Sequence, residues 1–341
     1  MMKFIHRTIL LTVAIGFLFA PLHGQRTVIK MGTLAPEGTA WHDVLLQMKQ
    51  DWSRLSDGKV VLRIYANGAL GDEYTMIRKM RIGQLQAVAL SGNGLSRIDP
   101  SISCLQIPLM FESYAELDYV REKMAPILEG NLEEKGFKVL SWADAGWVHF
   151  FTTRPAPTLD DIRGMKLLTS AGDPQTEELY KDFGFRVVPL PYTEVLTALQ
   201  TGMIEAVQGP PLFAMVQQWF GLAQNMTDIK WAPLIAATVI QQEAFDRIPA
   251  QLRAQLLESG QRAGRQLLQD IRSLNEEAIP AMTKRGLNRV QIDSQAADLW
   301  RSEAIQAYPK LRGRYVSEEL FDEVLRLRDE FRRKSDSQAP E

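Results

Sequence analysis

The sequence has few of the side chains that metal centres and covalent active sites require. Its 341 residues include one cysteine, Cys104, and four histidines. A single cysteine cannot form an internal disulfide or a cysteine-based zinc site. The chain also offers no Gly-x-Ser-x-Gly elbow, no phosphate-binding loop and no convincing Cys/His pair. We therefore predict a protein that is not an enzyme and that uses neither a metal ion nor another cofactor.

An excess of charge of one sign is also absent. The chain has 39 basic and 41 acidic residues and a formal net charge of −2. Nucleic-acid binding proteins usually carry a clear basic excess, so we expect no nucleic-acid partner. The contents of hydrophobic residues (45%) and charged residues (23%) are typical of globular domains. The length indicates about two domains.

The first two dozen residues predict the cellular compartment. Lys3 and Arg7 precede an apolar stretch at residues 8–20, and small or turn-forming residues follow. A membrane-spanning helix needs about 20 apolar residues, so we interpret residues 1–24 as a cleaved signal peptide, with a retained anchor as the alternative. No cysteine lies near the cleavage site, which excludes a lipoprotein. The mature protein is predicted to be periplasmic.

The rest of the chain alternates between strand and helix patterns. We expect strands at residues 28–34, 59–65, 85–90, 138–142 and 148–152, among others, with helices between most of them. This alternation is typical of an α/β fold with mainly parallel sheets. A long helical pattern begins after Pro249 and reaches about residue 278. Helices from about Ala296 and from Ser317 close the chain, and we predict a flexible tail at residues 331–341.

A helix–glycine–strand unit occurs twice. It spans residues 77–88 with Gly83 and residues 195–207 with Gly202. Glycine adopts the left-handed conformation that ends a helix, and the strand that follows points its carboxyl end at a crevice. The repeat indicates two similar lobes that face each other, which is the architecture of a hinged binding protein. The alternative is that this connection is simply common in α/β folds.

Several motifs along the chain resemble motifs of one known family. Gly-Thr-Leu-Ala-Pro at residues 32–36 and Asn-Gly-Ala-Leu-Gly-Asp-Glu at 67–73 resemble the first lobe of solute receptors of tripartite ATP-independent periplasmic (TRAP) transporters, the DctP-like family. Residues 146–155, 159–166, 189–195 and 198–205 resemble later signatures of that family in the right order. The resemblance covers about residues 27–290.

The resemblance implies a two-lobed periplasmic binding protein-like fold with a ligand cleft between the lobes and a long bridging helix. It places lobe 1 at residues 25–145 plus about 231–257, and lobe 2 at residues 146–230 plus about 258–330. Such receptors capture a small molecule by hinge closure and deliver it to membrane permease subunits. A different class of function remains open, in which a ligand-sensing module presents its closed form to another periplasmic protein.

The chain departs from the family at its ligand-binding arginines. Leu168 stands where typical members hold a substrate carboxylate with an arginine, and a second family arginine falls at Val148. A buried carboxylate without a cation is costly, so we predict a neutral, apolar or amphipathic ligand. An alternative keeps a carboxylate ligand through Arg154 or Lys166. Strand alternation places Lys166 on the same face as Leu168.

Other predicted ligand contacts come from the motifs and from aromatic side chains, each of which is also a candidate for the core. The segment Gln-Gly-Pro-Pro-Leu-Phe at residues 208–213 replaces a polar stretch of many family members, and Trp219 is a further aromatic candidate. We interpret His149 as structural. The predicted ligand-binding set is Leu34, Asp72, Asn93, Trp147, Val148, Phe150, Leu168, Gln208, Pro210, Phe213 and Trp231.

Overall fold

The computed structural model describes residues 26–171 and 173–337, so the predicted signal peptide lies outside the described residues. The strands of the described part are joined in the order β2-β1-β3-β9-β4-β7-β5-β6, and β8 pairs with both β4 and β10. Their bounds are β1 (Thr27–Thr33), β2 (Val60–Tyr65), β3 (Ala87–Ser91), β4 (Phe137–Thr152), β5 (Lys166–Ser170), β6 (Arg186–Leu190), β7 (Ala206–Gly209), β8 (Asn225–Thr227), β9 (Ala232–Gln241) and β10 (Asn288–Val290).

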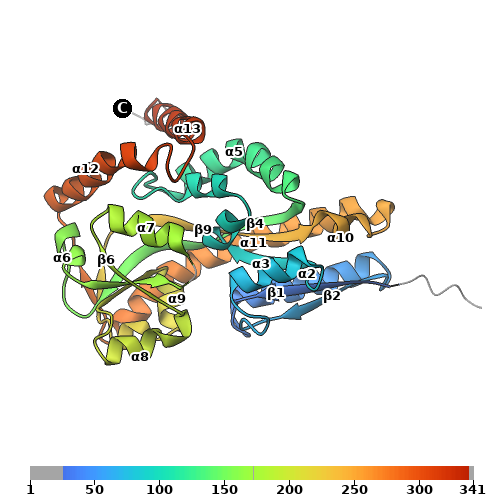
Figure 1. Cartoon of the computed structure of the whole chain (residues 1–341), viewed down its shortest axis with the longest axis horizontal. Coiled ribbons are helices and arrows are strands. Elements are labelled where there is room, and N and C mark those ends of the chain that lie inside the picture. Colours follow the sequence, from blue (N-terminus) through green and yellow to red (C-terminus); the bar gives the residue numbers. More distant parts are fainter. Residues whose placement is uncertain (1–25, 172, 338–341) are drawn as a thin grey trace, which may run out of the picture.

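Helices cover these strands on both sides and confirm the predicted α/β class (Figure 1). Their bounds are α2 (Ala40–Leu55), α3 (Glu73–Arg81), α4 (Gly92–Ile98), α5 (Tyr114–Glu134), α6 (Leu159–Arg163), α7 (Pro174–Asp182), α8 (Val195–Gln200), α9 (Pro211–Val216), α10 (Gln242–Asp246), α11 (Ala250–Thr283), α12 (Ser294–Leu311) and α13 (Glu318–Asp336), with 3-10 helices η1 (Pro100–Leu105), η2 (Tyr192–Glu194) and η3 (Trp219–Gly221).

The molecule has two lobes. The first is built on β1, β2 and β3, which are parallel, and β3 pairs antiparallel with β9. The second is built on parallel β5, β6 and β7, and β7 pairs antiparallel with the end of β4. In Figure 1, α2 and α3 lie with the first lobe, and α6 to α9 lie with the second. The two lobes therefore each carry their own sheet and their own helices.

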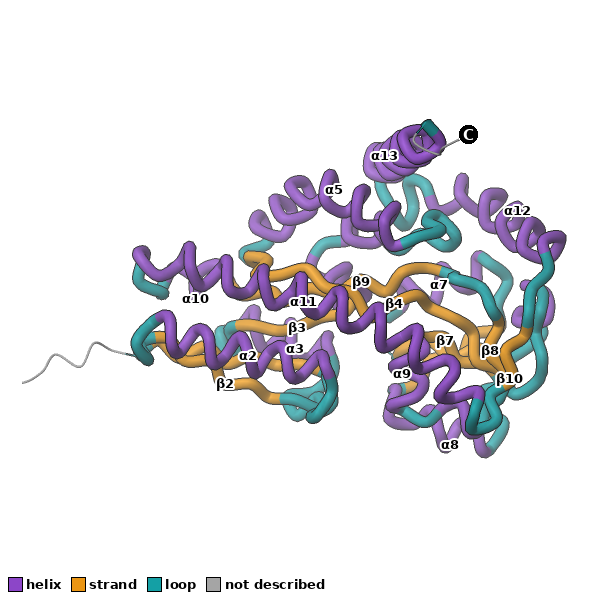
Figure 2. Tube along the Cα trace, turned by 180° about the vertical axis from the view of Figure 1, so that it is seen from behind, coloured by secondary structure: helices purple, strands orange, loops and turns teal. Residues whose placement is uncertain are grey.

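Two long strands and one long helix of the described chain run through both lobes. Strands β4 and β9 run antiparallel beside each other and take part in both halves of the sheet. Helix α11 crosses the back of both, from α2 at one end to α9 at the other (Figure 2). The prediction of separate strands at residues 138–142 and 148–152 is wrong, because β4 is continuous and pairs with β9 throughout, with register shifts that absorb the irregular residues.

One of these shifts lies between Asp144 and Gly146, at the point where β4 passes from one lobe to the other. Gly146 has a φ of 114°, a conformation that side-chain-bearing residues rarely adopt. Asn275 of α11 packs against it, donates to the Ala145 carbonyl at 2.9 Å, and accepts the N–H of Leu212 in α9 at 2.9 Å. A single amide thus joins the bulge of β4, α11 and α9.

We expect Gly146→Ala to lower the free energy of unfolding by more than about 1 kcal/mol, because the backbone conformation excludes a β-carbon. A β-carbon at this position would also lie 2.5 Å from the Asn275 amide nitrogen. Urea unfolding measures the effect. Gly130→Ala in α5 is the matched control, since a β-carbon there meets nothing within 4 Å, and alanine should stabilise the helix by about 0.5–1 kcal/mol. Equal behaviour of the two variants would contradict the prediction.

The C-terminal helices differ from the prediction. Residues 331–336, placed in a flexible tail, continue α13, because Arg332 pairs with Glu116 of α5 at 2.5 Å and the ammonium of Lys334 donates to the Tyr119 hydroxyl at 2.9 Å. These contacts also place α13 on α5, whereas the lobe boundaries predicted from the sequence put residues 317–330 in the second lobe (Figure 1).

Candidate functional site

The two lobes contact each other near the carboxyl ends of β3 and β5. Arg97 of α4 faces Asp173, which precedes α7, with 3.9 Å between Nη2 and Oδ1. Nearby, the amide of Gln175 donates to the Ser103 hydroxyl at 3.4 Å. Carboxyl ends of parallel strands are the usual place for ligands in α/β proteins. We call this region the interlobe site; its polar residues are Glu73, Arg97, Ser103 and Gln106 of the first lobe and Thr169, Asp173, Gln175, Tyr192 and Gln208 of the second.

Glu73 supports the first-lobe side of the interlobe site. Its carboxylate accepts the N–H of Ser91 at 2.6 Å and the Ser91 hydroxyl at 2.7 Å. Burial raises the pKa of Glu73, the bonds from Ser91 oppose the shift, and nearby Asp173 raises the pKa further. A β-carbon at Gly94 would lie 2.7 Å from this carboxylate. Glu73 therefore holds the start of α4 in place.

Asp173 has one engaged and one unengaged carboxylate oxygen. Oδ1 accepts the N–H of Thr176 at 3.2 Å, which caps α7, and it is also the atom that faces Arg97. Oδ2 is buried and has no hydrogen-bond partner within residues 26–171 and 173–337. Asp173 thus presents a free acceptor at the boundary between the lobes.

Gln208 and Thr169 lie on one face of the second-lobe sheet. Gln208 is paired with Phe150 across β7 and β4, and the parallel register of β5 and β7 brings Thr169 level with Gln208. Burial raises the pKa of Tyr180, and the nearby Trp231 and Gln208 side chains oppose this shift. Gln208 Oε1 and Thr169 Oγ1 are buried and lack a partner among the described residues.

Some of the predicted ligand contacts lie at or near the interlobe site. Asn93 accepts from the Gln106 amide at 3.4 Å. Leu34 follows β1 and is 41% exposed. Phe213 of α9 packs on Trp219 with 5.1 Å between ring centroids and on Tyr192 at 6.0 Å. These residues and Gln208 could contact a ligand held between the lobes.

Other predicted contacts have clear structural roles. Asp72 caps α3 by accepting the N–H of Thr75 at 2.7 Å. Pro210 occupies the N-cap position of α9. The Val148 carbonyl accepts the N–H of Trp231 at 2.9 Å, which ties β4 to the start of β9. Each of these roles is satisfied without a ligand.

The predicted aromatic contacts Phe150 and Trp231 form part of the core. They pack together at 5.5 Å between ring centroids, and both are almost fully buried. Their other aromatic neighbours are Phe183, Phe185 and Trp300. Trp147 lies outside this group, where it packs on Tyr114 of α5 at 5.3 Å and its indole nitrogen has no partner among the described residues.

Leu168 is fully buried in the second-lobe core. It shares a hydrophobic cluster with residues of α8, β7 and α9, including Val195, Val207 and Leu212. Because side chains alternate along a strand, Leu168 and Thr169 point to opposite faces of the sheet. Leu168 therefore lies on the face opposite to Gln208.

The proposed replacement cations lie at the wrong end of the sheet. The Lys166 ammonium donates to the Gly202 carbonyl at 2.5 Å, at the amino end of β5. A strand advances about 3.3 Å per residue, so Thr169 lies about 10 Å further along. Arg154 is exposed and lies beside Gly164, also away from the interlobe site. A carboxylate clamp built from Arg154 or Lys166 is thus contradicted.

Arg97, Asp173 and Gln106 are interlobe-site residues that the sequence reasoning missed. One signal was available for Arg97, because it stands four residues after Asn93 and such residues share one face of a helix. For Asp173 the sequence shows only a helix cap before Pro174. His149, by contrast, fits its predicted structural role: burial lowers its pKa to about 4, and Nδ1 lies 3.3 Å from the Thr227 carbonyl oxygen.

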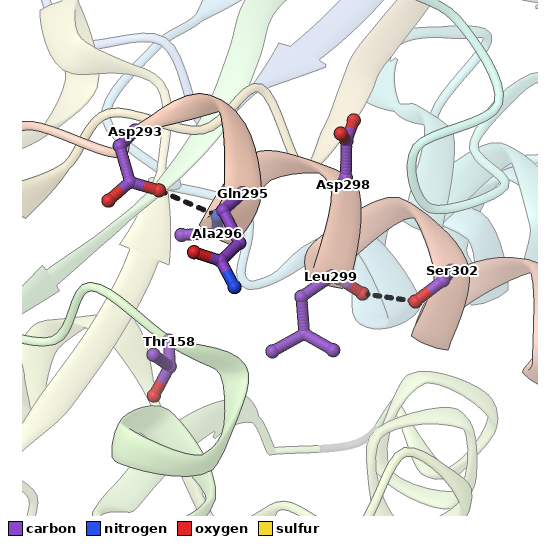
Figure 3. Close-up of a pocket in the computed structure, with 7 residues that line it drawn as sticks. All are labelled: Thr158, Asp293, Gln295, Ala296, Asp298, Leu299 and Ser302. Carbon is purple, nitrogen blue, oxygen red and sulfur yellow. Dashed lines mark hydrogen bonds between the residues drawn. The ribbon is translucent and has the colours of Figure 1, made fainter.

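A hollow lies on the surface of the second lobe, with a volume of about 550 Å³. Figure 3 shows its lining side chains on α12 and beside α6: Thr158, Asp293, Gln295, Ala296, Asp298, Leu299 and Ser302. Asp293 caps α12 by accepting the N–H of Ala296 at 2.8 Å. This hollow is formed by helix ends of one lobe. Among the described residues, its lining includes neither a first-lobe residue nor a buried hydrogen-bond acceptor that lacks a partner. It is a weaker candidate than the interlobe site.

The described part of the chain contains neither a cluster of potential metal ligands nor a membrane-spanning helix. Within residues 26–171 and 173–337, His, Cys, Asp and Glu side chains do not gather in groups of three or more that could hold a metal ion. Across the same residues, every helix is too short or too polar to cross a membrane.

Comparisons with a family model and with individual proteins agree on one family. A model of the family described as bacterial extracellular solute-binding protein, family 7 (DctP), matches residues 31–313. The 2,3-diketo-L-gulonate-binding periplasmic protein YiaO of Escherichia coli K12 is 26% identical over 234 residues, which are 67% of this chain and 70% of that protein.

Solved structures share the fold. A TRAP periplasmic solute binding protein from Desulfovibrio desulfuricans with bound sn-glycerol-3-phosphate has a TM-score of 0.82 at 22% identity, and the match covers 90% of this chain and 97% of that one. The sugar acid binding protein DctPAm from Advenella mimigardefordensis in complex with galactonate has a TM-score of 0.82 at 19% identity, with coverage of 90% and 99%.

Proposed function

Because the chain belongs to the DctP family of bacterial extracellular solute-binding proteins, we propose that it is a periplasmic receptor for a small molecule, exported by a cleaved signal peptide. The receptor captures its ligand by closing its two lobes and then delivers it to the permease subunits of a TRAP transporter. The observation that carries this proposal is the arrangement of the interlobe site, whose polar residues come from both lobes, opposite the connections through β4, β9 and α11. The lobe boundaries expected from the sequence, with α13 reassigned to the first lobe, are part of the proposal.

The ligand that we propose is neutral and amphipathic. The relatives named above bind acids, according to their names: a diketogulonate, a glycerol phosphate and galactonate. In this chain the two arginine positions of the family hold Val148 and Leu168, both buried and aliphatic. Exposed apolar surface beside the interlobe site, at Leu34 and Tyr192, suits an apolar part of the ligand.

A carboxylate-binding receptor is the second candidate, and Arg97 is the observation that favours it. An arginine at the interlobe site can bind a carboxylate through two charge-assisted hydrogen bonds. In this chain, however, Arg97 faces Asp173 at 3.9 Å, so a ligand carboxylate would have to compete with a resident one. We therefore rank this candidate below the neutral ligand.

Hinge closure gives the test of the receptor function. Native mass spectrometry of the exported protein, followed by denaturation, identifies the molecule that co-purifies with it. Small-angle scattering then compares ligand-free and saturated protein. We expect the radius of gyration to fall on saturation, because contacts to both lobes exist only in the closed state and the ligand shifts the population toward it. An unchanged scattering profile at saturation would count against the receptor mechanism.

A further inference from the structure

We infer that the polar end of the ligand donates hydrogen bonds and carries no negative charge, so that it consists of hydroxyl or amino groups. The inference rests on the proposed receptor function and assigns the chemistry of its ligand. It follows from the type of polar atom that the interlobe site leaves without a partner.

Four side-chain atoms of the interlobe site are buried and have no hydrogen-bond partner in the described part of the chain. They are Gln106 Oε1, Thr169 Oγ1, Asp173 Oδ2 and Gln208 Oε1. Three of the four can only accept a hydrogen bond, and the threonine hydroxyl can both accept and donate. Buried acceptors are costly when they stay unpaired. A ligand hydroxyl or amino group pairs with them, whereas a carboxylate or phosphate brings further acceptors.

The fixed charges around the interlobe site also oppose an anionic ligand. Burial raises the pKa of Glu73 in the first lobe and of Tyr192 in the second, and the nearby charge of Asp173 raises both further. Arg97 faces Asp173, so a carboxylate of the protein already stands beside this guanidinium. A ligand end that carries hydrogen-bond donors and no negative charge is attracted by the carboxylates of Glu73 and Asp173, whereas an acidic ligand is repelled.

The orphan acceptors are divided between the lobes. Gln106 belongs to the first lobe and packs against Gly92 at the start of α4, where a β-carbon would collide with the amide oxygen. Asp173 and Gln208 belong to the second lobe. A molecule with several hydroxyl groups can therefore satisfy acceptors of both lobes at once, and it does so only when the lobes are together, which couples recognition to closure.

Matched ligand pairs test the inference. We would measure binding to the mature full chain by isothermal titration calorimetry with compounds that differ at one end group: galactitol against galactonate, and D-glucose and D-glucosamine against D-glucuronate. The hydroxyl and amino compounds of at least one set are expected to bind at least about 10-fold more tightly than the acid, the factor that one hydrogen bond to a charged group supplies. Tighter binding of the acids, or binding of none of these compounds, overturns the inference.

The variant Asp173→Asn gives a result of opposite sign for the two ligand classes. Asparagine also caps helices, so α7 keeps its start. The change removes the charged acceptor and the negative charge that faces Arg97. We expect the affinity for the best hydroxyl or amino compound to fall about 10- to 100-fold and the affinity for the matched acid to rise. Unchanged affinity for the hydroxyl or amino compound overturns the inference.

Control variants separate recognition from folding. Asp293→Asn makes the same chemical change at the cap of α12, outside the interlobe site, and should leave every affinity unchanged. Thr169→Val removes one orphan hydroxyl with little change of shape, and the affinity for the hydroxyl compound should fall about 2- to 10-fold even if Asp173→Asn does not fold. Scattering with the tightest binder of the panel tests the receptor function separately: acid binding with closure rejects the inference alone, and binding without closure rejects the receptor mechanism.

Discussion

Arg272→Ala is expected to lower the free energy of unfolding by about 3–5 kcal/mol, because it removes the cation that hydrogen-bonds to a buried carboxylate. Arg272 of α11 donates to Asp144 of β4 at 2.8 and 3.1 Å and to Asp118 of α5 at 2.6 and 2.7 Å. The Asp144 side chain is fully buried. The guanidinium also stacks on the Tyr114 ring at 4.1 Å. One side chain thus joins α5, β4 and α11 beside the bulge at Gly146.

The destabilisation should depend on pH. Burial raises the pKa of Asp144, and Arg272 opposes this shift. Without Arg272 the folded-state pKa rises further above the unfolded value, so the folded variant binds more protons than the unfolded chain. Its stability therefore falls as the pH rises through the carboxyl range, and the difference from the native protein shrinks as the pH is lowered toward about 4.

Urea unfolding at neutral pH and at low pH measures both effects. Arg262→Ala is the matched control on the same helix, because the Arg262 side chain is 50% exposed and pairs with Glu258 at 2.7 Å in solvent. An exposed pair contributes about 0–1 kcal/mol. A loss below 1 kcal/mol in Arg272→Ala, or a loss equal to that of the control, would show that the buried ion cluster contributes little to stability.

Leu168→Arg is expected to destabilise the protein by about 3–5 kcal/mol or to prevent folding, and not to create a carboxylate site. Leu168 is completely buried among Val195, Leu199 and Val207. An arginine at this position would bring an unpaired charge and a longer side chain into a packed core, and both changes are unfavourable. We therefore expect that an arginine at this one position is not sufficient to create a carboxylate site.

Thermal unfolding and titration with galacturonate check this prediction. Leu168→Met is the matched control, since a substitution that conserves volume costs less than about 1.5 kcal/mol. A folded Leu168→Arg protein that binds galacturonate would contradict the prediction and would show that the guanidinium reaches the interlobe site from the other face of the sheet.

The sequence predicted those parts of the fold that depend on local patterns. The helices of the two helix–glycine–strand units end at Gly83 and Gly202, and both glycines have the positive φ of a helix-ending residue. The long helix was also predicted, and it runs from Ala250 to Thr283. The sequence predicts a break within β4, but the strand is continuous. Its pairing with β9 accommodates a bulge, and the irregular residues of that bulge interrupt the hydrophobic pattern of the sequence.

The interlobe site was harder to predict than the fold. Gln208 and Asn93 were predicted from motifs. Arg97 and Asp173 belong to different lobes, and only the folded structure shows that they face each other. Large aromatic residues such as Phe150 and Trp231 suit a binding site and a core equally well in sequence, and packing alone distinguishes the two. A local pattern shows which residues share an element, and it does not show which elements meet.

The position of α13 has a consequence for how far the lobes can separate. Between α12 and α13, Arg314 and Tyr315 contact Asp182 of α7 in the second lobe, while Arg332 near the end of α13 holds Glu116 of α5 in the first. The chain therefore crosses the lobe boundary once more after β4, β9 and α11, and this last crossing depends on side-chain contacts instead of sheet pairing. If the lobes open and close as proposed, every contact that α13 keeps during opening reduces the range of open conformations, and with it the conformational entropy that a ligand must overcome on closure.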